Sequence, residues 1–285
     1  MAISDDGKEL LRNRIATPKE DYHKIIVAIG TLIKNAEIEL KHECTVGICT
    51  PGSLSPSTGL LRNSNTICMN GMPFKQDFEK HLGREISVAN DANCFALSEA
   101  IDGAAQDADT VFGVIVGTGT GGGLVINKQV LMGTNAIAGE WGHNHLPWPD
   151  DGELELTKCW CGQQGCIETF LSGPGFESEY ERISNQKLAA EKIVGLMLND
   201  DRHAVQAMHL YEHRMARSLA HVINIFDPEV IVLGGGMSNL QHIYKSVPKL
   251  WQKWIFSDQV STKLIPPKFG DSSGVRGAAW LGGWC

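Results

Sequence analysis

The sequence predicts an α/β fold, in which strands and helices alternate along the chain. Short apolar runs typical of buried strands are interleaved with segments whose apolar residues recur at helical spacing. Several of these runs end in glycine or polar residues, as strands do where an α/β fold carries its chemistry. The 285 residues suffice for one large domain or two smaller ones.

The alternation starts in the first third of the chain. Residues 21–40 predict an amphipathic helix, because five aliphatic residues lie on one side of it: Ile25, Ile26, Ile29, Leu32 and Ile33. Residues 77–83 predict a short helix that Gly83 ends. Three further segments predict two strands and then a strand that runs into a helix: residues 9–17, 44–52 and 84–104.

The remainder of the chain alternates around a long loop. Residues 110–131 predict a hairpin of apolar strands around a glycine-rich turn, and residues 133–173 predict a loop region. Three later segments predict a long amphipathic helix, a buried strand opening onto glycines, and a helix of small residues: residues 204–227, 228–239 and 272–283.

Composition and charge restrict the class of protein. The formal net charge of -8 argues against a nucleic-acid partner, because such proteins normally present a basic face. No apolar run approaches the roughly 18 residues that a membrane span needs, and the first residues do not resemble a secretory signal. We therefore expect a cytoplasmic protein without membrane or nucleic-acid partners. In that compartment a close cysteine cluster more often binds metal or takes part in catalysis than forms a disulfide.

Two glycine runs at predicted strand ends are candidates for phosphate binding. Glycine lets backbone amides approach a phosphate, and a threonine hydroxyl adds a donor. The first run, GTGTGGG, contains Thr118 and Gly119. The second run consists of Gly234, Gly235 and Gly236. Each run alone is also typical of an ordinary tight turn, and neither is a Walker loop or a dinucleotide fingerprint.

Asp91 is the candidate general base. It follows a predicted buried strand and begins a predicted helix, where a carboxylate can take a proton from a substrate hydroxyl. The alternative is that Asp91 is only the N-cap of that helix, a position that aspartate favours.

A polar loop follows the hairpin. Glu140 can accept hydrogen bonds from sugar hydroxyls, and His143, three residues later, can bind a metal or a hydroxyl. His145 is an alternative to His143 in both roles.

Three cysteines lie within the segment CWCGQQGC: Cys159, Cys161 and Cys166. One possibility is a disulfide with one thiol left over. The other is a tetrahedral zinc site completed by an upstream histidine, which would be structural because it has no open position. Glu168 lies two residues after the last cysteine, so a metal that holds the turn would also position Glu168.

Taken together, these motifs resemble the ROK family of sugar kinases and repressors, over essentially the whole chain. The motifs occur in the order PGS, NDANC, GTGTGGG, AGEWGH, CWCGQQGCIETFLSG and IVLGGGMSN. Within the family the chain is most similar to bacterial fructokinases, through HNHLPW, NGMPF and GDSSGVRGAAW. The resemblance implies an actin-like, ribonuclease H-like fold of two α/β domains, with sugar and ATP in the cleft between them.

The resemblance also implies roles for individual residues. Asp91 is the general base. The implied sugar contacts are Asn65, Asn90, Glu140, His143 and Glu168. The implied nucleotide contacts are Thr118, Gly119, Gly234, Gly235 and Gly236. The implied zinc ligands are His143, Cys159, Cys161 and Cys166. Mg²⁺ is expected to accompany ATP.

The predicted function is ATP-dependent phosphorylation of a hexose, with fructose converted to fructose 6-phosphate. Glucose, mannose or N-acetylglucosamine are the alternative acceptors, and a sugar-binding protein without kinase activity is the alternative of another class. A homodimer is expected, as in relatives.

The expected domains are residues 1–109 and residues 110–272, with a helix over about 273–285 packing back on the first domain. The family opens with a strand and an Asp-x-Gly-Gly-Thr-Lys phosphate loop, which this sequence lacks. We therefore expect that the natural chain starts upstream of Met1 and that the missing strand belongs to the first domain's sheet.

Overall fold

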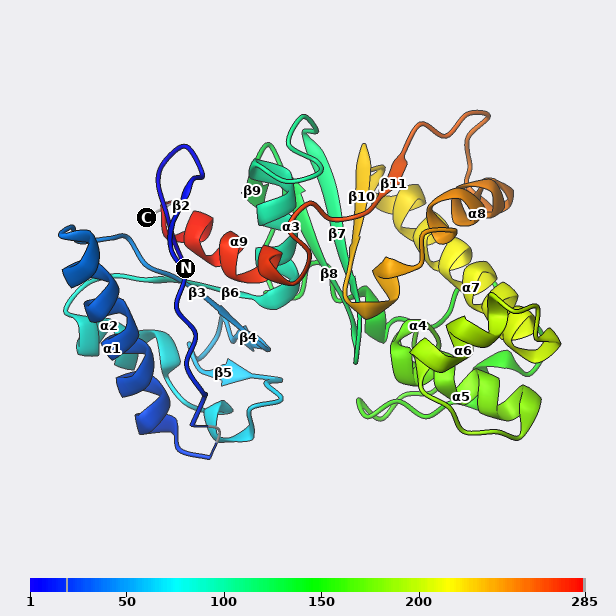
Figure 1. Cartoon of the computed structure of the whole chain (residues 1–285), viewed down its shortest axis with the longest axis horizontal. Helices are drawn as coiled ribbons and strands as arrows, with labels where there is room; N and C mark the ends of the chain where they lie inside the picture. The colour runs from blue at the N-terminus through cyan, green and yellow to red at the C-terminus, as the bar shows by residue number, and fades with distance from the viewer. Residues whose placement is uncertain (19, 284–285) are drawn as a thin grey trace.

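The computed structural model describes residues 1–18 and 20–283 (Figure 1). Its largest sheet has the strand order β11-β10-β7-β8-β9. Strands β7, β10 and β11 run parallel, and β8 and β9 are antiparallel to their neighbours. The strands are β7 Thr110–Val116, β8 Thr120–Ile126, β9 Gln129–Val130, β10 Val230–Gly234 and β11 Lys263–Ile265.

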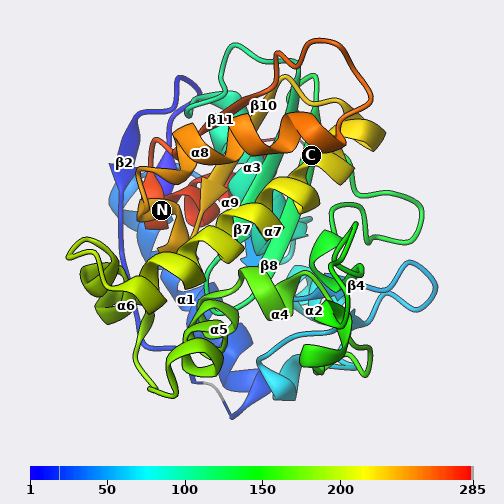
Figure 2. The same ribbon diagram turned by 90° about the vertical axis from the view of Figure 1, so that its right-hand side faces the viewer.

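Helices cover both faces of this sheet because its central strands are apolar on both sides. Val111 and Val232 pack with α3 (Asp91–Ile101), whereas Phe112 and Leu233 pack in the core formed with α7. Figure 2 shows α7 lying across the strands. The remaining helices of this part are α4 Glu168–Leu171, α5 Gly173–Ser184, α6 Ala190–Met197, α7 Arg202–Phe226 and α8 Ile243–Leu250.

The amino-terminal part has a separate core, in which Ile25 and Ile26 of the first helix meet Phe74 and Phe78 of the second. Its short strands form three two-stranded ladders, β1 with β2, β3 with β6 and β4 with β5, and among the described residues no ladder joins them. The elements are β1 Ala2–Ile3, β2 Glu9–Leu11, α1 Tyr22–Leu40, β3 Gly47–Thr50, β4 Ser53–Leu54, β5 Leu61–Arg62, α2 Phe74–Leu82 and β6 Ser87–Asn90.

Helices α3 and α9 (Ser273–Gly282) connect the two parts. A Cβ on Gly277 would fall 1.7 Å from the carbonyl oxygen of Cys94, so only glycine permits this close helix packing. The buried carboxylate of Glu99 accepts from the Ser273 hydroxyl at 2.7 Å and ties α3 to the start of α9. The expected domain boundary near residue 109 falls between α3 and β7. Helix α3 nevertheless packs on the sheet that contains β7.

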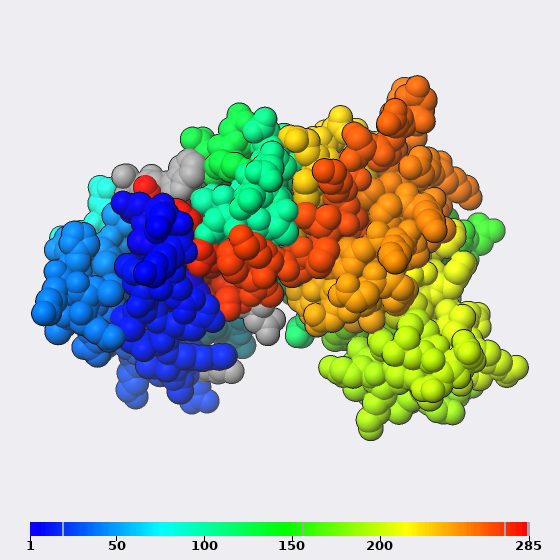
Figure 3. Space-filling view, turned by 45° about the horizontal axis from the view of Figure 1, so that its top comes forward, coloured from blue at the N-terminus to red at the C-terminus, as the bar shows by residue number. Residues whose placement is uncertain are grey.

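Figure 3 shows the blue amino-terminal part and the yellow-green helical part as separate masses with a hollow between them. Single helical turns add to the connections: Ile67–Met69, Trp141–His143, Glu153–Leu156, Gly236–Asn239, Trp251–Trp254 and Gly270–Ser272. In the part of the chain that the structure describes, no helix has the length and apolar character to traverse a bilayer.

The structure confirms the predicted helices over residues 21–40 and 204–227, and it corrects three other expectations. The predicted strand over residues 9–17 is formed only at Glu9–Leu11. The glycine-rich turn of the hairpin is shorter than expected, because Gly121 already lies in β8. The final helix ends at Gly282, and residues 284–285 lie outside the described residues.

Candidate active site

At the junction between β6 and α3, two adjacent side chains have different roles. Asn90, in extended conformation, is the N-cap: its Oδ1 accepts from the backbone N–H of Asn93 at 2.7 Å. Asp91 is the first helical residue, and its Oδ1 accepts from the N–H of Ala92 at 2.9 Å. The hypothesis that Asp91 is merely the helix cap is therefore wrong, because Asn90 fills that position.

The carboxylate of Asp91 is open to solvent on one side, although protein surrounds it on the others. This burial raises the pKa of Asp91, and the N–H groups of Ala92 and of Asp91 itself offset only part of the effect. A carboxylate with a raised pKa is a better proton acceptor, so Asp91 suits general base catalysis.

The position of Glu140 depends on the turn that follows it, which packs closely on β8. The residue precedes the turn Trp141–His143, and the indole N–H of Trp141 donates to the carbonyl of Gly121 at 3.0 Å. A Cβ on Gly142 would lie 2.0 Å from the carbonyl oxygen of Thr120, so a side chain there would push this turn away from the strand.

Burial raises the pKa of Glu140, and four charged or titratable groups nearby modulate it. His143 and Arg62 lower this pKa, whereas the carboxylates of Asp91 and Glu168 raise it. Because such interactions fall off with distance, these five side chains share one electrostatic environment. Four of the five are implied site residues, drawn together from positions far apart in the sequence.

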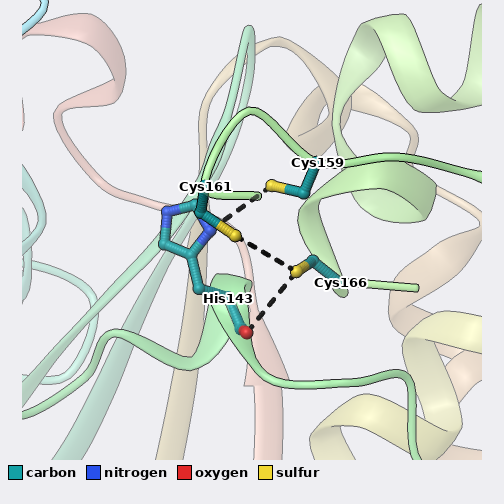
Figure 4. A group of neighbouring side chains, drawn as sticks. All are labelled: His143, Cys159, Cys161 and Cys166. Carbon is teal, nitrogen blue, oxygen red and sulfur yellow. Dashed lines mark hydrogen bonds between the residues drawn. The ribbon is translucent and has the colours of Figure 1, made fainter. Parts of the chain in front are cut away.

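The three cysteines and His143 converge on one point (Figure 4). The ligand atoms of all four residues lie within 4.8 Å of one another. Sγ of Cys159 is 3.6 Å from Nδ1 of His143, and Sγ of Cys161 is 3.6 Å from Sγ of Cys166. Four ligands around tetrahedral zinc would be roughly 3.5–3.8 Å apart, so the donor set and spacing fit zinc. A disulfide needs about 2.05 Å between sulfurs, and His145 is exposed and outside this group.

Two glycines shape the turn that carries the cysteines. Gly162 and Gly165 have φ of 92° and 68°, a region that favours glycine. A Cβ on Gly165 would also lie 2.6 Å from a methyl of Leu154. The backbone N–H of Cys159 donates to the carbonyl of Gln163 at 2.8 Å and closes the turn. This backbone conformation directs the three thiols toward one another.

Glu168 begins α4 and connects the cysteine turn to the first glycine run. Its Oε2 accepts from the N–H of Thr120 at 3.0 Å, and its Oε1 accepts from the indole N–H of Trp160 at 2.8 Å. A Cβ on Gly119 would lie 2.7 Å from Oε2, so a side chain at this position would require the Glu168 carboxylate to shift.

The two predicted nucleotide loops lie side by side because β7 and β10 are parallel neighbours. An added Cβ on Gly117 would be 3.9 Å from Cα of Gly235. Gly235 has φ of 82°, and its Cβ would lie 2.5 Å from the carbonyl oxygen of Val116. Thr118 is exposed and lines a cavity of about 730 Å³ together with Glu168. Exposed amides and a hydroxyl at adjacent strand ends can bind phosphate.

Asn65 lines a second cavity of about 860 Å³, whose walls are residues of the segment 55–71 and Trp160. Among its described lining residues Asn65 is the one implied sugar contact, and Trp160 is the residue that this cavity shares with the cavity beside Glu168. Sequence reasoning assigned no role to Arg62 or Trp160. Arg62 donates to the carbonyl of Asn135 at 2.7 Å, and nothing in its local sequence indicates that partner.

The fold and this arrangement define a sugar kinase of the actin-like, two-domain class, as comparison with solved structures confirms. A ROK hexokinase from Thermus thermophilus is 27% identical, with a TM-score of 0.83 over 94% of this chain and 88% of that chain. A ROK glucokinase from Streptomyces griseus, in complex with glucose and AMPPNP, is 26% identical, with a TM-score of 0.76 over 98% of this chain and 93% of that one.

The chain belongs to the ROK family, whose model matches residues 1–283. An N-acetyl-D-glucosamine kinase from Vibrio cholerae is 39% identical over 284 residues, which cover 98% of this chain and 94% of the relative. The kinase of the same name from Haemophilus influenzae is 38% identical over 288 residues, 98% of this chain and 93% of the relative. The protein is an ATP-dependent sugar kinase.

Proposed function

We propose that Asp91 takes the proton from the primary hydroxyl of a hexose as that hydroxyl attacks the γ-phosphate of ATP in line. The observation that carries this proposal is the position of Asp91: a carboxylate of raised pKa that follows the end of β6 and begins α3, and whose charge also raises the pKa of Glu140. Catalysis then depends on positioning and electrostatic stabilisation, with Mg²⁺ on the phosphates of ATP.

The remaining site residues bind and orient the two substrates in this proposal. Sugar hydroxyls are bound by Asn65, Asn90, Glu140, His143 and Glu168. His143 directs Nδ1 to Cys159, which leaves Nε2 for a sugar hydroxyl. The phosphates are bound at Thr118, Gly119, Gly234, Gly235 and Gly236, mainly through backbone amides.

An assay of ADP release tests this proposal. We expect turnover with at least one of fructose, glucose, mannose and N-acetylglucosamine, and none with the 6-deoxy analogue of the same sugar. Binding of a hexose in calorimetry without ADP release would overturn the kinase reaction. It would support a sugar-binding protein instead.

Two acceptors have specific support. N-acetylglucosamine is supported by the names of the 36–39% identical relatives, which span 98% of the chain. Fructose is supported by the segments HNHLPW, NGMPF and GDSSGVRGAAW, through which the chain resembles bacterial fructokinases. Values of kcat/KM for both sugars, measured side by side, decide between them, because kcat/KM is the measure of discrimination between competing substrates.

We also propose one structural zinc ion on His143, Cys159, Cys161 and Cys166, where it would hold Glu168 and the adjoining loop in place. Elemental analysis of protein purified without added metal should give about one zinc per chain. His143→Ala should lower this content, whereas the matched variant His145→Ala should leave it unchanged. Zinc retained by His143→Ala would assign the fourth ligand elsewhere.

A further inference from the structure

Trp160 is the most exposed tryptophan among the described residues. It lies between two of the clustered cysteines, and 71% of its side chain is exposed, although tryptophan is highly buried on average. The exposed ring lies at the wall of two cavities. It lines both the 860 Å³ cavity beside Asn65 and the 730 Å³ cavity beside Glu168 and Thr118.

Two contacts orient this exposed ring. Its Nε1–H donates to Oε1 of Glu168 at 2.8 Å. Its ring meets His143 edge to face, with centroids 5.0 Å apart and an angle of 87° between the planes. Its backbone lies between Cys159 and Cys161, two of the clustered cysteines. An aromatic ring that is already oriented by such contacts loses less conformational entropy when a ligand binds.

The cavity beside this ring has polar and apolar lining residues, and a hexose has polar hydroxyl groups and an apolar C–H face. Besides Trp160 and two leucines, the cavity lining includes Arg62, Asn63, Ser64 and Asn65, whose polar groups can bind hydroxyl groups. The tryptophan supplies the apolar, aromatic wall, which can cover the C–H face of a sugar ring.

We propose that Trp160 is a specificity-determining residue of the sugar site: its indole face packs on the carbon face of the hexose while its N–H positions Glu168. This inference rests on the proposed function of the same site. Glu168 receives one hydrogen bond on each carboxylate oxygen, from Trp160 and from Thr120. Each oxygen keeps a further lone pair, so the carboxylate can still accept from the sugar.

Two substitutions separate the role of the ring from that of the N–H group. Trp160→Phe keeps an aromatic face but removes the donor, and it should raise the KM for the better of fructose and N-acetylglucosamine about tenfold. Trp160→Ala removes both and should raise KM about a hundredfold. In both variants kcat should stay within about threefold of wild type, because binding before the chemical step is what is lost.

Fluorescence and zinc analysis distinguish this role from a purely structural one. Titration with the sugar should change the tryptophan fluorescence of the wild type and of the control variant Trp148→Phe, but not that of Trp160→Phe. Zinc content should be the same in the wild type, Trp148→Phe and Trp160→Phe. A wild-type KM for Trp160→Ala, or a KM rise that follows zinc loss, would overturn the proposal. If the wild type binds a hexose without phosphorylating it, the kinase function fails while the fluorescence titration still tests Trp160.

Discussion

Asp91→Asn is expected to lower kcat by about 10²- to 10⁴-fold, the usual contribution of a general base. Asparagine keeps the size of aspartate and can accept from the N–H of Ala92, but it cannot take the proton of the sugar hydroxyl. The hexose dissociation constant, measured by calorimetry, should therefore stay within about threefold of wild type.

The matched control for this substitution is Asp107→Asn, which makes the same chemical change at an exposed position before β7 and should leave kcat unchanged. The pH profile supplies a second readout. Burial raises the pKa of Asp91, so the wild-type kcat/KM should fall on acidification at a pH above the ordinary aspartate value of about 3.9. Asp91→Asn should lose this acid limb. Wild-type turnover in the variant would exclude Asp91 as the base.

Glu153→Ala is expected to destabilise the protein by about 3–5 kcal/mol, the usual cost of removing one partner from a buried ion pair. The turn Glu153–Leu156 lies between His143 and the cysteines, and its first residue is 5% exposed. The urea concentration at the unfolding midpoint, with the slope m held common to both proteins, measures the loss.

The expected destabilisation by Glu153→Ala follows from a network of buried ion pairs. This network connects the turn before the cysteines to α7. Glu153 accepts from Nε of Arg214 at 2.7 Å and from Nη2 of Arg217 at 2.8 Å, and both arginines are 3% exposed. Arg214 also donates to Glu179 at 3.0 Å. Without Glu153, Arg214 keeps Glu179. Arg217, in contrast, keeps the carbonyl of Trp148 and the exposed Asp150 at 3.9 Å, so a buried guanidinium loses its close carboxylate, which is costly.

Lys75→Ala is the control for the loss of Glu153, because it removes a 3.7 Å ion pair with Glu79 at the surface of α2. Exposed pairs of this kind contribute about 0–1 kcal/mol, so the midpoint should hardly move. Equal effects of the two substitutions would contradict the network.

The contribution of Glu153 should also depend on pH. Burial raises its pKa, but the hydrogen bond from Arg214 and the charges of both arginines outweigh this effect, so the folded-state pKa lies below the ordinary value. The stabilisation is therefore complete above the unfolded-state pKa of about 4.3 and is lost as the pH falls below it. The midpoints of wild type and Glu153→Ala should converge on acidification.

The sequence alone determined those features that depend on residues close together in the chain. The apolar spacing over residues 21–40 and 204–227 predicts the two helices, because a helix face is defined by neighbours three and four positions apart. The segment from Cys159 to Cys166 predicts a cluster of thiols because three cysteines lie within it, whereas the structure brings His143 to the same cluster. The predicted junction of strand and helix likewise indicates that Asp91 lies at the edge of a site, because chemistry in open α/β folds is found where strands end.

Only the tertiary structure decided which side chains act together. The sequence does not distinguish the cap role of Asn90 from the exposed carboxylate of Asp91, because the distinction depends on backbone angles. Likewise, the pairing of Glu153 with Arg214 spans 61 residues, and Trp160 and Asn65 line one cavity because two separate parts of the chain meet there. Contacts of this kind leave no local periodicity in the sequence, because packing of distant segments alone creates them.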